Sequence, residues 1–253
     1  MNLDLQKASL LKRLSAFMLD FFVMILIAAG LMAIVYDVVG YDAKAAELQS
    51  YYEEYESVYN IDTQLSADEV AALSDADRAR YDEASLAFSK DERVMNVYSV
   101  LINLTIIITS ISLLLAHVVT EIVLPIIFKN GQTIGKKVFN IGVMRVDGVK
   151  VSVFQLFARA ILGRFTIETM LPLLLLMMMF FGIMGGIALV VVLLLLVLQI
   201  IVISVSKTNS AIHDLLAVTV TVDLESQKIF ESEAELIEFK KKLAEIKANE
   251  APY

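Results

Sequence analysis

One carboxylate stands inside the first long apolar stretch of the chain. Asp20 lies within Leu14–Tyr36, a run of 23 residues with no other charge. A charge at the centre of a membrane-spanning helix costs about 2.5–3.5 kcal/mol on insertion scales, so it needs a function or a partner. Arg13 precedes Asp20 by seven residues, which is two helical turns, so both share one helix face. Asp20 is a candidate proton or cation site, with neutralisation by Arg13 or Arg159 as the structural alternative.

Two further carboxylates occur in a repeated local pattern. Glu121 and Glu168 each stand four residues before a proline, in the sequences EIVLP and ETMLP. Proline has no N–H, so the helical carbonyl four residues earlier loses its partner, and here that carbonyl belongs to the glutamate. A carboxylate beside a free backbone oxygen suits a small cation. A kinked helix end whose glutamate reaches the headgroups would leave the same pattern.

A histidine completes this set of candidates. His117 stands four residues before Glu121 and therefore shares its helix face. Low dielectric favours the neutral form of a carboxyl, so Asp20 and Glu121 can carry protons with His117 as a relay. The sequence thus predicts an ion or proton path through Asp20, His117, Glu121 and Glu168.

The remaining motifs argue against catalysis. The sequence GQTIGKK at 131–137 has one residue too few between its glycines for a phosphate-binding loop, and no Ser or Thr follows its lysine. We expect it to deliver Lys136 and Lys137 to anionic headgroups instead. The pair His213–Asp214 has no nearby nucleophilic serine or third metal ligand, and the chain has no cysteine. We therefore expect no enzyme, no cofactor, no metal site and no nucleic-acid partner.

Several membrane-spanning helices are needed to position these residues. Hydrophobic residues make up 58% of the chain, against about 45–50% in soluble domains. They gather in uncharged runs long enough to cross a ~30 Å hydrocarbon core. The first run is too long for the apolar part of a signal peptide and contains an acid, so we expect a retained span.

The number of spans depends on the last run. Residues 169–206 are 38 uncharged residues, which would form a helix about 57 Å long. Tilting does not fit that length to the membrane, so two short spans joined by the glycines of 182–186 fit better, with a single span as the alternative. We predict an all-α membrane protein with about four transmembrane helices, near 14–36, 97–124, 167–184 and 186–206.

The distribution of charge predicts the orientation. Residues 129–165 hold 7 Lys and Arg against one acid, whereas residues 37–95 hold 15 acids against 5 Lys and Arg. Short loops rich in Lys and Arg stay in the cytoplasm. The N-terminus and 129–165 are therefore expected inside and 37–95 outside, and four spans return the C-terminus to the cytoplasm.

The segments outside the membrane carry patterns of their own. Ser66 and Ser74 each open a capping-box sequence, which predicts an acidic helical insertion over 37–95. This insertion is either a solvated segment or a partner-binding cap. The tail 231–250 predicts a charged helix with an apolar stripe too short for a coiled coil.

The basic segment has strand character. Residues 139–145 and 149–152 flank a Val-Asp-Gly turn, which predicts a small cytoplasmic β-hairpin, and 217–222 can add a third strand. Residues 154–165 predict an amphipathic helix lying in the membrane interface. The cations expected to contact anionic lipid headgroups are Lys136, Lys137, Arg159 and Arg164, with the buried acids as the alternative partners of the two arginines.

Three motifs follow one another along the chain: KRLSA at 12–16 with Asp20, GQTIGK at 131–136 before the Val-Asp-Gly turn, and HDLLAVT at 213–219. Together they resemble the RDD family of bacterial membrane proteins, named for one arginine and two aspartates. The resemblance implies that Arg13, Asp20 and Asp214 are those residues, gathered at the inner face of a bacterial plasma membrane. It also implies activities proposed for some members, sodium/proton antiport or small-solute transport. The insertion 37–95 departs from the family pattern.

Two functions follow from these observations. The first is a small transporter, with cation/proton antiport as its specific form, that works as a homo-oligomer because four spans enclose little volume. The second is a non-transporting scaffold that assembles or recruits other proteins through the insertion and the tail. The expected partners are the lipid bilayer with anionic headgroups and a small cation or proton.

The predicted segments are 1–36 with the first span, 37–95 as the insertion, 96–128 with the second span, 129–165 as the basic loop, 166–206 with the last two spans and 207–253 with the closing motif and tail helix.

Overall fold

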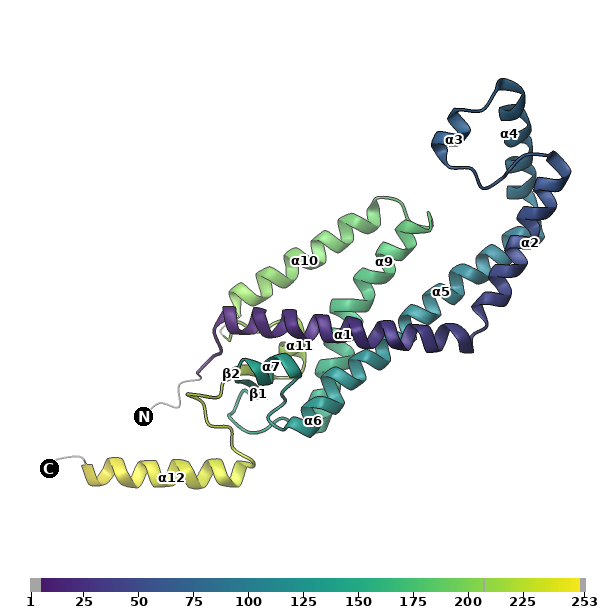
Figure 1. Ribbon diagram of the computed structural model, residues 1–253. Coiled ribbons are helices and arrows are strands. Elements are labelled where there is room, and N and C mark those ends of the chain that lie inside the picture. Colours follow the sequence, from purple (N-terminus) through teal and green to yellow (C-terminus); the bar gives the residue numbers. More distant parts are fainter. Residues whose placement is uncertain (1–5, 207, 251–253) are drawn as a thin grey trace. The chain divides into compact units, whose positions relative to one another are not determined.

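Helices form almost the whole chain in a computed structural model that describes residues 6–206 and 208–250 (Figure 1). The chain divides into unit 1, residues 1–31 and 112–253, and unit 2, residues 32–111. The helices of unit 2 and the two helices that enter it are α1 (Leu10–Val38), α2 (Tyr41–Tyr59), α3 (Ala67–Ala71), α4 (Asp75–Lys90) and α5 (Glu92–Val118). The remaining elements are η1 (Val119–Val123), α6 (Leu124–Phe128), α7 (Ile134–Val138), β1 (Ile141–Arg145), α8 (Val153–Phe157), η2 (Ala158–Met170), α9 (Leu171–Phe180), α10 (Ile187–Val205), α11 (Ile212–Leu216), β2 (Thr219–Asp223) and α12 (Glu233–Glu250).

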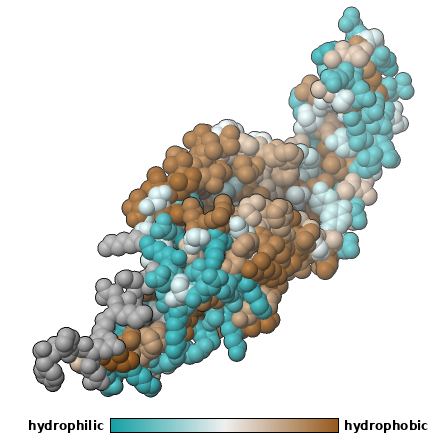
Figure 2. All heavy atoms as spheres, turned by 60° about the vertical axis from the view of Figure 1, so that its left-hand side comes forward, coloured by the Kyte–Doolittle hydropathy of each residue, from teal (hydrophilic) through white to brown (hydrophobic). Residues whose placement is uncertain are grey.

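Four helices in the described part of the chain are long and apolar enough to cross a membrane, which confirms the prediction of about four spans. They cover Leu10–Val38, Glu92–Phe128, Val153–Phe180 and Ile187–Val205. Apolar side chains cover much of their outer surface, whereas the helices of unit 2 expose mainly hydrophilic side chains (Figure 2). An apolar surface of this extent requires a lipid environment. The third and fourth spans lie side by side as a helical hairpin, closed by the glycine-rich turn that follows α9.

The third span begins earlier than the sequence predicted. The predicted interfacial helix 154–165 is continuous with the helix Val153–Phe180, which as a whole is long and apolar enough to cross a membrane. Its two arginines need no headgroups because buried carboxylates neutralise them: Arg159 pairs with Asp214 and Arg164 with Glu121. Patterns of apolar residues cannot reveal such partners, which come from distant parts of the sequence.

Both glutamate–proline sequences lie at π-helical segments. The Leu124 N–H bonds the Val119 carbonyl at the end of η1, and the Leu171 N–H bonds the Thr166 carbonyl at the end of η2. A proline follows each leucine directly. Because proline cannot continue the ordinary hydrogen-bond pattern, wider turns relieve the crowding before it. The predicted distortion is therefore present, and each distorted segment contains one of the candidate glutamates.

The predicted β-hairpin forms only a short contact, with Met144 opposite Lys150 and the Arg145 N–H bonded to the Val149 carbonyl, and β1 has its longer pairing elsewhere. Strand β1 pairs antiparallel with β2, from Ile141 opposite Asp223 to Arg145 opposite Thr219. The turn at Asp147–Gly148 forms, and the Gly148 N–H bonds the Arg145 carbonyl. Residues after the turn make only isolated bridges, because Phe230 exchanges backbone hydrogen bonds with Gly148 and Lys150. The segment expected as an additional strand is thus the principal partner of β1.

Unit 2 is a helical hairpin with capped helices. Ser66 forms the predicted capping box at the start of α3, and the Ser74 side chain accepts the Asp77 N–H at the start of α4. The ring of Tyr52 stacks on Phe88 with centroids 4.6 Å apart, which holds α2 against α4. These contacts confirm that residues 37–95 are largely helical.

The predicted tail helix is also present and is anchored at its start. Leu236 is buried with Phe230 and Val149, and Phe239 packs against this group. Lys150 pairs with Glu231 at 2.7 Å beside it. The first turns of α12 therefore belong to unit 1, while Ile246 is more than half exposed.

Candidate functional site

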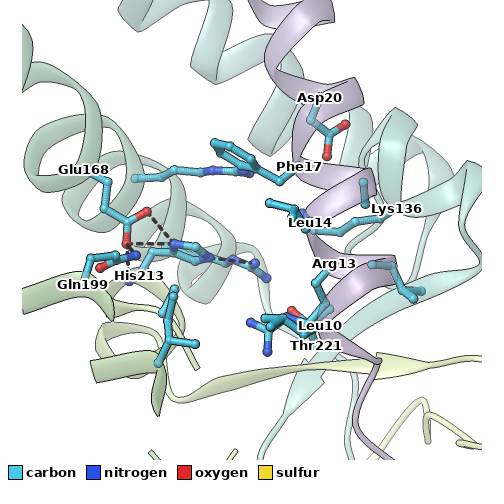
Figure 3. Close-up of a pocket in the computed structure, with 16 residues that line it drawn as sticks. Leu10, Arg13, Leu14, Phe17, Asp20, Lys136, Glu168, Gln199, His213 and Thr221 are labelled. Atoms are coloured by element: carbon cyan, nitrogen blue, oxygen red, sulfur yellow. Dashed lines mark hydrogen bonds and ion pairs between the residues drawn. The ribbon is translucent and has the colours of Figure 1, made fainter. Parts of the chain in front are cut away.

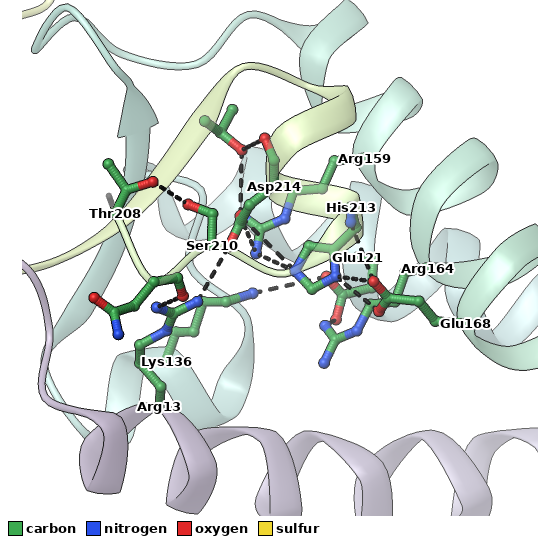
Figure 4. A network of polar contacts seen from close by, with 12 residues as sticks. Arg13, Glu121, Lys136, Arg159, Arg164, Glu168, Thr208, Ser210, His213 and Asp214 are labelled. Atoms are coloured by element: carbon green, nitrogen blue, oxygen red, sulfur yellow. Dashed lines mark hydrogen bonds and ion pairs between the residues drawn. The ribbon is translucent and has the colours of Figure 1, made fainter. Parts of the chain in front are cut away.

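Nine charged or titratable side chains come together in unit 1; Figure 4 labels all of them except Asp20, which Figure 3 shows. Arg13 and Asp20 come from α1, Glu121 from η1, Lys136 from α7, three side chains from η2, and His213 with Asp214 from α11. We call them the buried charge cluster: Arg13, Asp20, Glu121, Lys136, Arg159, Arg164, Glu168, His213 and Asp214.

Asp214 is the most enclosed member of the cluster, with no exposed surface. Its carboxylate pairs with Arg159 at 3.1 Å and with Arg13 at 3.2 Å, and it accepts the Thr219 hydroxyl at 3.3 Å. Burial alone would raise the pKa of this carboxyl, but Arg159, His213 and Arg13 outweigh burial and lower it to about 2. Asp214 is therefore a permanent anion that ties α1 to η2 and α11.

Asp20 is held by a different segment, the turn before α7. Its two oxygens accept the Thr133 hydroxyl at 2.5 Å and the Gly135 N–H at 2.7 Å. The approach is so close that a Cβ on Gly135 would lie 2.1 Å from the carbonyl oxygen of Ala16. The GQTIGKK motif therefore packs directly against α1, and this packing requires a glycine at Gly135.

Glu168 and His213 form a carboxylate–imidazole pair. The histidine Nδ1 lies 2.8 Å from one carboxylate oxygen, and its backbone N–H donates to the other at 3.1 Å. Gln199 of α10 donates a further hydrogen bond to Glu168 at 3.1 Å. Gly163 permits the pair to form, since a Cβ there would lie 2.5 Å from the His213 Cβ.

Glu121 is fully enclosed by cations. It pairs with Arg164, and its second oxygen lies 3.7 Å from the Lys136 Nζ. Burial lowers the pKa of Lys136 to about 8, against the opposing attraction of Glu121. Lys136 is thus the member of this group that loses its proton most readily on the alkaline side.

His117 lies apart from these ion pairs. It is 1% exposed, its Nδ1 contacts the Leu113 carbonyl at 2.9 Å and its Nε2 lies 3.4 Å from the Thr169 hydroxyl. Phe165 packs edge-on against its ring. The structure therefore brings His117 into contact with its own helix and with η2 rather than into a hydrogen bond with Glu121.

A cavity of about 300 Å³ opens beside the cluster (Figure 3). Figure 3 shows Glu168, His213 and Gln199 on one side and Arg13, Asp20 and Lys136 on the other. Four cationic side chains line the cavity against two carboxylates, because Glu121 and Asp214 do not line it. The lining residues are Leu10, Arg13, Leu14, Ala16, Phe17, Asp20, Lys136, Ile141, Arg159, Arg164, Glu168, Gln199, Ile203, Ala211, His213 and Thr221.

The structure places three of the four predicted headgroup contacts inside the protein. Lys136 and Arg159 are 6% and 4% exposed, and Arg164 is enclosed beside Glu121. Lys137 remains on the surface, over the Phe128 ring. The expectation of surface contacts is corrected for the three buried cations, and for the two arginines the alternative expectation, pairing with buried acids, describes the structure.

Sequence reasoning missed several residues that hold the cluster together. Thr133 and Gly135 belong to a motif assigned to headgroups, and the pairing of His213 with Glu168 joins two motifs considered separately. Gln199 had a visible signal, since it is the only amide in the uncharged run 169–206. No group of three or more His, Asp and Glu side chains in the described residues is placed to hold a metal ion.

The fold and the site define a multipass membrane protein whose spans are joined by buried ion pairs. Residues 7–218 match the family described as the RDD family, and the chain belongs to it. Comparison with curated proteins and with solved structures found no match. The three family residues expected from the motifs, Arg13, Asp20 and Asp214, lie in one cluster, where Arg13 contacts Asp214 and Asp20 contacts the α7 segment.

Proposed function

We propose that this protein is a proton-coupled transporter of a small solute, with the Glu168–His213 pair as the proton carrier. The observation that carries the proposal is the cavity of about 300 Å³ with this pair in its wall. Histidine is the side chain best suited to proton exchange near neutral pH. Ionisable groups inside a membrane protein commonly mark ion or proton pathways.

The arrangement also supports a particular order of events. A proton on His213 makes an ion pair with Glu168, and its loss leaves Glu168 with the Gln199 amide and a backbone N–H as donors. The electrostatics of the cavity wall therefore change with one proton. A solute that senses this change is bound differently in the two states, which is the requirement for coupling.

Cation/proton antiport, the version predicted from the sequence, is retained as one outcome of the test. Asp20 already accepts two hydrogen bonds from the protein, so a cation at Asp20 would have to displace them. Glu168 also accepts hydrogen bonds, from Gln199 and from the backbone and ring of His213, but its histidine partner can change charge. These contacts support Glu168 over Asp20 as the coupling carboxylate.

Reconstituted liposomes test the proposal. Lumenal pH is followed under imposed gradients of sodium, potassium, lithium and inorganic phosphate, with wild type, Glu168→Gln and the exposed control Glu238→Gln. We expect solute-dependent proton movement in wild type and Glu238→Gln and its loss in Glu168→Gln. Equal flux in a correctly folded Glu168→Gln variant would contradict the proposed role of the pair.

A second candidate function is a membrane scaffold. The cluster joins α1, both π-helical segments, α7 and α11 by ion pairs, and such a network supports a purely structural purpose. Unit 2 and α12 would then be the surfaces that recruit other proteins. Wild-type protein that moves no protons under any gradient, and whose co-purifying partners disappear when 41–90 is replaced by a short linker, would favour the scaffold.

A further inference from the structure

The wall of the cavity has an uneven charge. Arg13, Lys136, Arg159 and Arg164 line it, whereas the carboxylates that neutralise them, Glu121 and Asp214, lie behind the wall. The two acids that do line it are already engaged, Asp20 by Thr133 and Gly135 and Glu168 by His213. A ligand in the cavity therefore meets more cationic than anionic surface.

Arg159, which lines the cavity, has one buried N–H without a hydrogen-bond partner among the described residues. Arg159 is 4% exposed, and its Nε has no hydrogen-bond partner among residues 6–206 and 208–250. The other end of the guanidinium contacts Asp214 and the His213 Nε2. Buried polar groups without partners are rare and costly. A guanidinium with a free Nε–H is suited to donate a hydrogen bond to one oxygen of an oxyanion.

Another part of the cavity wall is apolar. Leu10, Leu14 and Phe17 of α1 line it and are 67%, 55% and 45% exposed, and Ile203 of α10 also contributes. These side chains lie within or next to spans that face lipid. A basic pocket beside lipid-facing helices is the arrangement that binds anionic headgroups, since the headgroup meets the cations and the hydrocarbon meets the apolar wall.

We propose that this cavity is a binding site for a phosphate oxyanion, held by Arg159 and Lys136, with an attached hydrocarbon chain against Leu14 and Phe17. This proposal rests on the proposed function in one respect, since the phosphate compound would be the solute that the transporter carries. Binding is nevertheless independent of transport, because a headgroup can occupy the cavity in a protein that moves no protons. The phosphate can come from a phospholipid or from a free phosphate, and the probes below separate these sources.

The experiment measures binding to the full chain in detergent micelles by native mass spectrometry. The probes are dioleoyl phosphatidylglycerol, dioleoyl phosphatidylcholine with the same chains, and inorganic phosphate. Preference for phosphatidylglycerol over phosphatidylcholine supports an anionic lipid as the source. Binding of inorganic phosphate that competes with the lipid supports a free phosphate. The absence of both effects in wild type overturns the proposal, whatever the variants do.

Two variants separate the cavity from the protein surface. Arg159→Lys keeps the charge beside Asp214 but removes the free Nε donor, and we expect about tenfold weaker binding of the favoured probe. Lys240→Gln removes an exposed cation of α12 and should bind as wild type does. An equal loss in both variants would assign the binding to surface charge and overturn the cavity site. Wild-type protein that binds the favoured probe but moves no protons would contradict the transport proposal alone.

Discussion

At the scale of single residues, the positive and negative charges of the buried charge cluster nearly cancel. Four cations, Arg13, Lys136, Arg159 and Arg164, stand with the four carboxylates Asp20, Glu121, Glu168 and Asp214, and His213 is the remaining titratable member. Removing one member of a buried pair is strongly unfavourable because it leaves the other charge without compensation. Substitutions in this cluster should therefore affect stability as well as function, and the histidine should be the most tolerant position.

Asp214 gives the clearest dependence on acid. Its pKa is lowered from 3.8 to about 2, so the stability it contributes is fully present above about pH 4 and is lost as the pH falls through about 2. Asp214→Asn should be less stable than wild type at pH 7 by about 3–5 kcal/mol and should lack this part of the acid transition. Far-UV circular dichroism during heating at several pH values measures both effects. The exposed Asp68→Asn variant should retain the wild-type profile, and an identical profile for Asp214→Asn would contradict the assignment.

The prediction for Gly135 rests on packing rather than on charge. Its hypothetical Cβ would meet the Ala16 carbonyl oxygen at 2.1 Å, so Gly135→Ala must push α7 away from α1 and break the hydrogen bond to Asp20. We expect a loss of about 1–3 kcal/mol or more in stability, measured by thermal unfolding in detergent. Gly30→Ala is the matched control, since nothing lies within 4 Å of its added Cβ and alanine favours a helix. Equal stability of the two variants would show that α7 does not need this close approach.

At the scale of elements, the sequence reveals what depends on neighbours in the chain and hides what depends on distant partners. The four apolar helices, the caps at Ser66 and Ser74 and the tail helix follow from local patterns. The distortion before Pro125 and Pro172 was also visible, because a missing N–H acts within one helix. The pairing of β1 with β2 was not visible, since their strands are separated by two spans and similar apolar segments compete as partners.

The attachment of α12 is a second property of elements that can be tested. The rings of Phe230 and Phe239 lie 5.2 Å apart, and Lys228 lies over both. Phe239→Ala should release the first turns of α12 and speed amide hydrogen exchange across 233–243, because exchange reports local opening. Ile246→Ala lies farther along the helix, where the side chain is 52% exposed, and should leave exchange unchanged. Slow exchange in Phe239→Ala would mean that the helix is held by its ion pairs instead.

At the scale of the whole molecule, charge is distributed along the chain in blocks. Residues 37–95 hold 15 acids against 5 Lys and Arg, and residues 129–165 hold 7 Lys and Arg against one acid. Three basic residues of 129–165, Lys136, Arg159 and Arg164, lie in the buried charge cluster. The net positive charge that this segment exposes is therefore smaller than its sequence suggests. Insertion nevertheless responds to the charges of the unfolded segment as it reaches the membrane, so the prediction that 129–165 faces the cytoplasm still applies.

The absence of cysteine from the chain permits a direct test of this orientation. Ser57 in α2 and Ser226 after β2 are exposed positions, and three apolar helices separate them along the sequence. If all three cross the bilayer, the two positions lie on opposite sides. In intact cells a membrane-impermeant maleimide should label Ser57→Cys and should reach Ser226→Cys only after lysis, with wild type as the unlabelled control. Labelling of both in intact cells would mean that one of the three helices does not span. Labelling of Ser226→Cys alone would keep the spans and reverse the orientation, and the charge cluster would then face the outside.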